Sequence, residues 1–393
     1  MNFPVTTRAS QDSAQPALCI VGKTGPALYG LTTAGRTRRL FARHGITRQL
    51  APADMTGYSG RVIVVRGDAA IDQPLIPVLA TSSSGLLLLG QGPSGDTPLA
   101  AVVDAAHVAA AESLLLGHTS GIAGVTLDRR TPGDLDTDFW KALRKRETPY
   151  AFAVSPANAA AVEWRMFMGT YKGATDIITK HVWPVPAFHA TRFLAPRGIT
   201  PNMVTTAAAV FTALAFWLFL EGHFALGLMA AWAMTFLDTV DGKLARTTLT
   251  SSKWGDVFDH GIDLVHPPFW YVAWGLGLSA AGFTWPPVTF WWVIAAILGG
   301  YVIQRVFEGI AIKWLGLEIH IWRPVDTLFR QITARRNPNL VLLTAFLLIG
   351  RPDWGLLAVA IWTVICLALH ALQLAQALAA RRAGPLTSWM TGR

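Results

Sequence analysis

The chain is 393 residues long; apolar residues make up 52 % of it and charged residues only 15 %. Soluble globular proteins carry about 25 % charged residues, so this composition indicates that part of the chain is surrounded by lipid. A disordered protein is excluded, because disorder requires low hydrophobicity and high charge. The two cysteines, Cys19 and Cys366, are too few and too far apart for a disulfide scaffold. The net charge of +9 suits a face toward anionic lipid or phosphate.

Residues 1–165 have the pattern of a cytoplasmic α/β domain. Short apolar runs that predict strands alternate with stretches that predict helices. The predicted strands are residues 17–21, 61–65 and 84–89, and the predicted helices are a basic one at 36–44 and an alanine-rich one at 100–115. This alternation favours a small layered fold with a mostly parallel, Rossmann-like sheet.

Residues 166–200 mix aromatic and basic side chains. Trp183, Phe188 and Phe193 are interleaved with Lys180 and Arg192. Such a mixture is typical of a segment that lies in the headgroup layer, so we interpret this stretch as an interfacial juxtamembrane segment. A plain linker is the alternative.

Residues 201–393 predict an all-α domain with six transmembrane helices. The apolar runs are residues 203–220, 224–237, 264–281, 288–306, 340–349 and 354–378. Most approach the roughly 20 residues that a helix needs to cross a bilayer. Buried helices of a soluble protein are the alternative, which so many runs in a short stretch disfavour.

Lysine and arginine residues predict the orientation of these helices. They gather before the first run, after the second and fourth runs, and in the tail, whereas the three opposite connections contain only Arg351. Cytoplasmic loops carry the excess of basic residues. We therefore expect a multi-pass protein of the cytoplasmic (inner) membrane with both termini in the cytoplasm.

Four carboxylates surround the connection between the second and third runs. Asp238 and Asp241 are three residues apart, and Asp259 and Asp263 are four apart, so each pair shares one helix face. A carboxylate at the centre of a membrane costs roughly 2.5–3.5 kcal/mol, and four together repel one another. The cluster therefore requires cations, and all-oxygen ligands favour Mg²⁺ or Mn²⁺.

Other residues near the cluster suit a diphosphate. Gly242, Ala245 and Gly255 are small enough for close approach of a ligand, and Arg246 is a fixed cation. His260 is next to Asp259 and points to a different helix face. We interpret His260 and His266 as packing or supporting residues, which disfavours zinc.

The string Asp-x-x-Asp-Gly-x-x-Ala-Arg-x8-Gly-x3-Asp-x3-Asp, which begins at Asp238, resembles the signature of the CDP-alcohol phosphotransferases. The resemblance extends to the six apolar runs and to Pro201-Asn202, and so covers about residues 165–380. It implies a membrane enzyme of phospholipid biosynthesis that transfers a substituted phosphoryl group from a CDP-linked donor, CDP-diacylglycerol in our interpretation, to an alcohol with release of CMP. It also implies a homodimer.

The resemblance assigns roles by position. Asp238, Asp241, Asp259 and Asp263 would bind two divalent ions, and Asp263 would also act as the base on the attacking hydroxyl. Gly242, Ala245, Arg246 and Gly255 would line the CDP moiety. This assignment agrees with the general mechanism of phosphoryl transfer, in which two cations stabilise the attacking and leaving oxygens. Whether the lipid is the donor or the acceptor stays open.

Basic residues near the fourth run are candidate contacts for the acceptor. These are Arg305, Lys313, Arg335 and Arg336, together with Glu308 and the rest of the loop at residues 323–336. Several arginines favour an acceptor that itself carries phosphate, such as a polyol phosphate. Positive-inside bias explains most of them equally well. Arg305 is the exception, because it lies within an apolar run and needs a partner; Glu308, three residues on, is a structural candidate.

The first half weakly resembles a nucleotidyltransferase domain. Asp68 after the second strand would match a metal-binding aspartate, but the glycine-rich loop expected after the first strand is missing. Gly22-Lys23-Thr24 lacks the earlier glycine of a Walker loop, so little holds a triphosphate. We therefore expect a degenerate, noncatalytic domain.

Two alternatives remain open. A bifunctional enzyme would first transfer a cytidylyl group to a polyol phosphate and then condense the product. A cation transporter would line its pathway with the aspartates, which their place at one membrane edge disfavours. No nucleic-acid partner is expected, because the basic residues follow the predicted topology.

Overall fold

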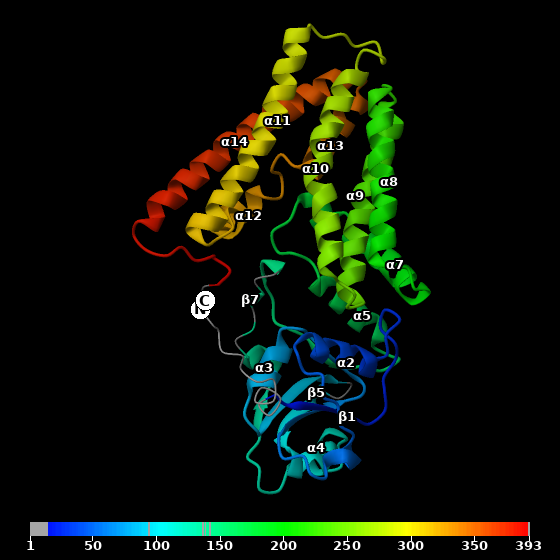
Figure 1. Cartoon of the computed structure of the whole chain (residues 1–393), viewed down its shortest axis with the longest axis vertical. Coiled ribbons are helices and arrows are strands. Elements are labelled where there is room, and N and C mark those ends of the chain that lie inside the picture. The colour runs from blue at the N-terminus through cyan, green and yellow to red at the C-terminus, as the bar shows by residue number, and fades with distance from the viewer. Residues whose placement is uncertain (1–14, 93–94, 136, 138, 141–142, 392–393) are drawn as a thin grey trace, which may run out of the picture. The chain divides into compact units, whose positions relative to one another are not determined.

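The computed structural model describes residues 15–92, 95–135, 137, 139–140 and 143–391 (Figure 1). The side chains of residues 253, 254, 256 and 258–260 are outside this description. The chain divides into two compact units. The first consists of Met1–Ala142, Arg146–Thr170 and Thr247–Leu249, and the second of Leu143–Lys145, Tyr171–Arg246 and Thr250–Arg393.

A mixed sheet forms the centre of the first unit. Among the described residues its order is β1-β2-β5-β4-β9-β3, with β6 paired to β4. The strands are β1 (Ala17–Val21), β2 (Arg61–Arg66), β3 (Ala69–Ile71), β4 (Leu86–Gly92), β5 (Gly95–Asp104), β6 (Asp128–Arg130) and β9 (Ala151–Ala153). A separate pair is β7 (Phe139–Trp140) and β8 (Lys145–Arg146).

The strands predicted at 17–21, 61–65 and 84–89 are present as β1, β2 and β4. The mostly parallel, Rossmann-like sheet is not confirmed. β1 and β2 are parallel, but β5 lies between β2 and β4 and is antiparallel to both. A hairpin connection from β4 to β5 takes the place of the helical crossover that a parallel pair needs.

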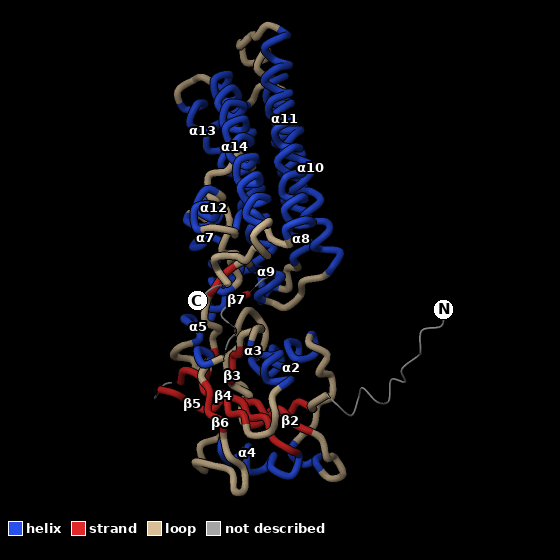
Figure 2. Tube along the Cα trace, turned by 90° about the vertical axis from the view of Figure 1, so that its left-hand side faces the viewer, coloured by secondary structure: helices blue, strands red, loops and turns tan. Residues whose placement is uncertain are grey.

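Helices cover both faces of this sheet (Figure 2). They are α2 (Thr33–Arg43) and α3 (Leu75–Thr81) on one face, and α4 (Val108–Leu115) on the other; α5 (Ala159–Gly169) completes the unit. The alternation along β2 explains the two layers. Ile63 and Val65 pack with Phe41 of α2, whereas Val62 and Val64 pack with α4. Successive strand residues point to opposite faces, so one apolar strand supplies two cores.

The helix predicted at 100–115 is wrong for its first half. Ala100 and Ala101 belong to β5, where both are fully buried and pair with β2 and β4. Alanine favours helices on its own, but here its pairing with strands on both sides overrides that preference. The helix itself begins at Val108.

The second unit is helical. Its elements are α6 (Ile177–His181), α7 (Pro184–Leu194), α8 (Pro201–Leu220), α9 (Phe224–Thr247), α10 (Lys253–Gly277), α11 (Pro287–Ile310), a π-helical turn (Ala311–Leu315), α12 (Pro324–Phe329), α13 (Arg336–Leu348) and α14 (Pro352–Arg381). One apolar core joins α8, α9, α10, α11, α13 and α14. At its centre the buried Trp274 stacks on Phe224 with ring centroids 4.4 Å apart, and its indole donates to the Pro352 carbonyl at 3.0 Å.

Four helices in the described part of the chain are long and apolar enough to cross a membrane. They are Pro201–Leu220, Phe224–Thr247, Pro287–Leu315 and Pro352–Arg381. The six predicted spans are therefore not confirmed. The other two runs are helical, but α13 has only 13 residues. At 1.5 Å per residue such a helix is about 20 Å long, which is shorter than the roughly 30 Å hydrocarbon core.

The predicted interfacial stretch contains α6 and α7. Asp176 caps α6 by accepting from the backbone of Ile178 and Thr179. On α7, Val185 and Phe193 are exposed, and the guanidinium of Arg197 lies 3.5 Å from the Phe193 ring centroid. The interfacial location itself stays a prediction.

Candidate active site

The aspartates of the motif lie on two helices. Asp238 and Asp241 are within α9, which continues past them to Thr247 instead of ending where the apolar run ends. Asp263 is within α10, and so is the backbone of Asp259, whose side chain lies outside the described residues. Asp241 is buried, Asp238 is largely buried and Asp263 is 41 % exposed. The three carboxylates therefore extend from the interior of the helical unit toward its surface.

One guanidinium joins the two helices. Arg336, the first residue of α13, donates from Nη2 to Asp238 Oδ2 at 2.6 Å and from Nη1 to Asp263 Oδ1. Its Nη1 also contacts Met234 Sδ at 3.5 Å. Although burial opposes its charge, the carboxylates of Asp238 and Asp263 raise the pKa of Arg336 above its ordinary value. The arginine that we predicted as an acceptor contact is thus bound to the acidic residues.

The start of α13 is held in place by neighbouring polar groups. Asn337 Nδ2 donates to Asp176 Oδ1 at 3.0 Å and lies 3.2 Å from Thr179 Oγ1. The backbone of Ile177 donates to the Gln331 carbonyl at 2.9 Å. These contacts tie the chain on both sides of Arg336 to α6, so they fix the position of the Arg336 backbone.

Asp241 faces α8. Its Oδ2 accepts a hydrogen bond from Thr205 Oγ1 at 2.6 Å. Its Oδ1 is buried and has no hydrogen-bond partner among the described residues. A buried carboxylate oxygen without a partner costs free energy, so this atom is suited to an additional ligand.

The chemistry of these side chains fits a hard divalent cation. The donors are carboxylate oxygens, which Mg²⁺ and Mn²⁺ prefer, and one of them is buried without a partner. Among the side chains that the structure describes, no three histidine, cysteine or acidic groups are close enough to hold a metal ion. Asp259 is outside that search, so the full set of four predicted ligands stays a prediction.

The predicted CDP contacts lie near the ends of α9 and α10. A Cβ added at Gly242 would lie 2.9 Å from Arg246 Nη2, so the absence of a side chain leaves room for the guanidinium one turn later. Ala245 is on the same helix and partly exposed. At Gly255 an added Cβ would lie 3.1 Å from both Asn202 Oδ1 and Ser252 Oγ. The glycine therefore permits close approach between the first turns of α8 and α10.

A second charged cluster surrounds Glu308 of α11. Arg305 Nη1 is 2.9 Å from Glu308 Oε2, as the predicted structural pair requires. His320 Nε2 is 3.0 Å from Glu308 Oε1, and Arg335 binds the same oxygen. Burial lowers the pKa of His320 to about 3 despite its hydrogen bond to Glu308. The histidine is therefore neutral at pH 7.

Arg330 is the unusual member of this cluster. It is 9 % exposed, and its Nε and Nη1 atoms are buried without a hydrogen-bond partner among the described residues. Burial, and then the charge of Arg335, lower its pKa well below the ordinary value. Lys313, by contrast, is exposed on the π-helical turn, and no described contact brings it to Glu308.

The sequence predicted packing or supporting roles for His260 and His266, and the structure describes the side chain of His266. His266 Nδ1 lies 2.6 Å from the Ile262 carbonyl, and its ring is 4.5 Å from Trp270, so this residue packs within the helix bundle. The side chain of His260 lies outside the described residues.

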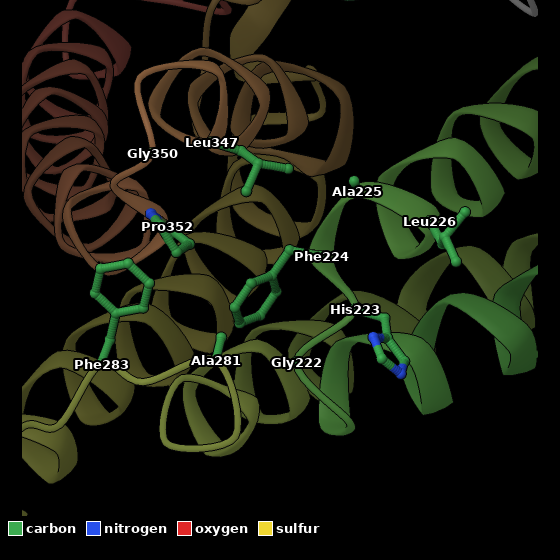
Figure 3. Close-up of a pocket in the computed structure, with 10 residues that line it drawn as sticks. All are labelled: Gly222, His223, Phe224, Ala225, Leu226, Ala281, Phe283, Leu347, Gly350 and Pro352. Atoms are coloured by element: carbon green, nitrogen blue, oxygen red, sulfur yellow. The ribbon is translucent and has the colours of Figure 1, made fainter.

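An apolar pocket of about 360 Å³ lies elsewhere in the second unit (Figure 3). Its lining includes Phe224 at the start of α9, Phe283 and Leu347. Asp238 is fourteen residues further along α9, or about 21 Å. The pocket holds none of the predicted site residues, so it is not the candidate active site.

The comparisons with known proteins bear on the segment that carries the aspartates. The model of the CDP-alcohol phosphatidyltransferase family matches residues 198–334. These residues form a CDP-alcohol phosphatidyltransferase domain. The matched segment includes all four aspartates and ends before Arg335 and Arg336.

Two curated relatives resemble a part of the chain. Choline/ethanolaminephosphotransferase 1 of Arabidopsis thaliana is 46 % identical over 76 residues, which are 19 % of this chain and 18 % of the relative. Choline/ethanolaminephosphotransferase 2 of the same organism is 43 % identical over 76 residues, with the same shares. The chain thus matches less than a fifth of the length of these relatives. The nucleotidyltransferase resemblance of the first half stays a prediction.

Sequence reasoning missed two polar residues within the CDP-alcohol phosphatidyltransferase domain. Thr205 on α8 binds Asp241 on α9, and His320 binds Glu308. A threonine one turn after Pro201-Asn202 carries no signal of its own in a single sequence. The basic residues between α12 and α13 did give a signal, but it did not separate Arg336 from Arg330 and Arg335.

Proposed function

We propose that this protein is an integral membrane transferase of phospholipid biosynthesis. It moves a substituted phosphoryl group from a CDP-linked donor, CDP-diacylglycerol, to the hydroxyl of a polyol or polyol phosphate and releases CMP. The observation that carries the proposal is the family match together with the placement of Asp238 and Asp263 within reach of one guanidinium group. The names of the two plant relatives describe phosphotransferases, which supports the reaction class.

The aspartates have distinct proposed tasks. Asp238, Asp241, Asp259 and Asp263 would hold two divalent ions, Mg²⁺ or Mn²⁺. When bound, such ions neutralise the diphosphate and stabilise the attacking and leaving oxygens. The carboxylate of Asp263 is the most exposed of those described, which supports the proposal that it accepts the proton of the acceptor hydroxyl. The new bond joins that oxygen to the donor phosphorus, and the bond to the CMP oxygen breaks.

The cytidine end of the donor would lie along Gly242, Ala245, Arg246 and Gly255. Gly255 leaves the first turn of α10 without a side chain where it approaches Asn202. Arg246 supplies a permanent positive charge for the diphosphate, because a guanidinium stays protonated at neutral pH.

The Glu308 cluster supports an acceptor that carries a phosphate group. Arg305 and Arg335 both bind the carboxylate of Glu308, and the charges of Arg335 and Glu308 both act on the buried guanidinium of Arg330. The three arginines outnumber this one carboxylate, so the set has excess positive charge. The unpartnered nitrogens of Arg330 would then bind phosphate oxygens, which guanidinium groups recognise well. Arg335, which binds Glu308, and Arg336, which binds the aspartates, are further candidate contacts for the acceptor. Lys313 is a weaker candidate because it is exposed.

The membrane arrangement follows from the basic residues. We place both termini and the basic connections on the cytoplasmic side of the inner membrane, because Lys and Arg accumulate there. A homodimer is implied by the family resemblance alone.

Replacement of Asp263 tests the reaction. Purified full-length protein is incubated with CDP-diacylglycerol, Mg²⁺ or Mn²⁺, and a panel of polyols and polyol phosphates, and CMP and lipid products are identified by mass. We expect Asp263→Asn to abolish CMP release while the circular dichroism spectrum stays unchanged, because the amide cannot accept the proton.

Asp128→Asn provides the matched control. Asp128 is an exposed carboxylate of β6 that pairs with Arg130, so this variant keeps wild-type CMP release. Full activity of Asp263→Asn would refute the assigned base. Absence of CMP release from wild-type protein with every acceptor and either cation would refute the proposed reaction.

A further inference from the structure

Arg336 binds the oxygens that the proposed function assigns to divalent ions. Its two Nη atoms contact Asp238 Oδ2 and Asp263 Oδ1, on α9 and α10 respectively. The guanidinium is 13 % exposed, and the better buried of its two partners is Asp238, which is 15 % exposed. The guanidinium already takes one lone pair of each of these oxygens, and its positive charge repels a divalent ion bound at the same carboxylates. The arginine and the metal therefore compete for these two side chains.

The position of Arg336 in the chain separates it from the aspartate motif. It lies two residues beyond the segment that matches the family. Its backbone is at the first turn of α13, which the contacts of Asn337 with Asp176 and Thr179 anchor. The side chain reaches the aspartates from a third helix, so it can leave them without any movement of α9 or α10.

We propose that Arg336 is the resident counter-ion of the acidic residues: it holds Asp238 and Asp263 together while no divalent ion is bound and withdraws when the ions bind. The inference rests on the proposed function, because it takes Asp238 and Asp263 as metal ligands. It goes beyond that function because the divalent ions, when they bind, replace the Arg336 guanidinium at the two carboxylates. The exchange keeps two carboxylates on neighbouring helices from facing each other without a cation.

A purely structural arginine predicts a different behaviour. If Arg336 only positioned the aspartates, its removal would misplace the ligands and weaken metal binding. If it competes with the metal, its removal makes all of the protein competent to bind. When the released form is about a tenth of the wild-type protein or less, the apparent affinity then rises at least about tenfold.

The test measures Mn²⁺ binding by the purified full-length protein in detergent, without nucleotide, from the EPR signal of free Mn²⁺. We expect Arg336→Gln to bind Mn²⁺ at least about tenfold more tightly than wild type. Arg336→Lys, which keeps the charge but loses the fork of donors, should bind with intermediate affinity. In EDTA, Arg336→Gln should unfold at a lower temperature than wild type, and Mn²⁺ should raise its unfolding temperature by more.

Arg323→Gln is the matched control. This substitution also removes one arginine charge. Arg323 immediately precedes α12, between α11 and α13, but its guanidinium pairs with Asp326 and Gln376. Its Mn²⁺ affinity should stay within about twofold of wild type, because its charge is not bound to the acidic residues.

The outcomes distinguish this inference from the proposed function. Equal or weaker Mn²⁺ binding by Arg336→Gln, in a preparation whose wild type binds Mn²⁺ and releases CMP, would overturn the exchange and leave the function standing. An equal gain in affinity for Arg323→Gln would also overturn it, since general charge repulsion would then explain the effect. Absence of Mn²⁺ binding by every variant would overturn both.

Discussion

Buried charges in the helical unit are shared among several partners. Glu308 accepts from Arg305, His320 and Arg335, and Arg336 serves two aspartates. Removal of one partner from such a group leaves a buried charge that costs several kcal/mol, whereas the complete group can be close to neutral. These side chains are therefore expected to respond strongly to single substitutions and to changes of protonation.

His320 makes the helical unit sensitive to acid. Burial lowers its pKa to about 3 in the folded protein, whereas an unfolded chain has an ordinary histidine near 6.5. Between these values the unfolded state binds more protons, so stability is complete above about pH 6.5 and falls as the pH falls toward 3. The loss at pH 5 is about 2 kcal/mol.

His320→Gln should remove this part of the acid sensitivity. The amide can still donate to Glu308 but does not titrate. Unfolding temperatures at pH 8 and pH 5 should differ less for this variant than for wild type. His223→Gln, in the exposed connection between α8 and α9, should keep the wild-type difference. Parallel pH profiles of wild type and His320→Gln would show that burial of this imidazole does not govern the acid response.

Sequence separation decided which of these contacts could be predicted. Arg305 and Glu308 are three residues apart on one helix, so their pairing follows from helix geometry alone. Arg336 is 73 residues from Asp263 and 98 from Asp238. No local rule links positions so distant, which is why the arginine was assigned to an acceptor and not to the aspartates.

At the scale of elements, the polar ends of helices were the least predictable part. The apolar pattern ends at Leu237, but α9 continues for ten residues through Asp238 and Arg246 to Thr247. A hydropathy pattern reports contact with lipid or core, whereas the backbone hydrogen bonds of a helix continue into its polar segment. The aspartates consequently lie within α9, and their spacing on one face holds.

Close contact between α8 and α10 provides an element-scale prediction. A Cβ at Gly277, the last residue of α10, would lie 1.9 Å from the Phe219 carbonyl oxygen at the end of α8. Gly277→Ala therefore forces these helix ends apart and should reduce the free energy of unfolding by about 1–3 kcal/mol. Thermal unfolding of the detergent-solubilised protein measures this loss.

Gly299→Ala is the control for helix propensity. Gly299 lies within α11, and a Cβ there meets no atom within 4 Å. This substitution should leave stability unchanged or raise it by up to about 1 kcal/mol, because alanine favours the helix. A similar change for both variants would show that the α8–α10 contact is not limiting.

For the whole molecule, composition predicted the separation into an α/β half and a helical half. Several strands and helices and the aspartate motif depend on neighbouring residues and could be predicted, and the family match covers the motif. The order of strands in the sheet could not be predicted in this way, because the position of β5 between β2 and β4 depends on pairings between strands far apart in the chain. Apolar composition also did not predict the length of α13, which is apolar but too short to span a membrane.

The first unit offers a further reason to expect no nucleotidyl transfer. Asp68, the candidate metal ligand, is bound by Arg66 from the same strand end, with Nε–Oδ1 and Nη2–Oδ2 distances of 2.9 and 2.6 Å. The loop after β1 packs against the same turn: a Cβ at Gly67 would lie 2.9 Å from the Lys23 carbonyl oxygen. A loop packed onto this turn leaves few backbone N–H donors free for a triphosphate.

We therefore expect the full-length protein to release no pyrophosphate from CTP with any polyol phosphate in the panel used for CMP release. An enzyme-coupled pyrophosphate assay measures this directly. Asp68→Asn should leave CMP release from CDP-diacylglycerol unchanged, because the first unit takes no part in that chemistry. Pyrophosphate release that Asp68→Asn removes would instead establish the bifunctional enzyme. Both assays use one preparation, so active transferase with no pyrophosphate release separates a noncatalytic first unit from a protein that is inactive throughout.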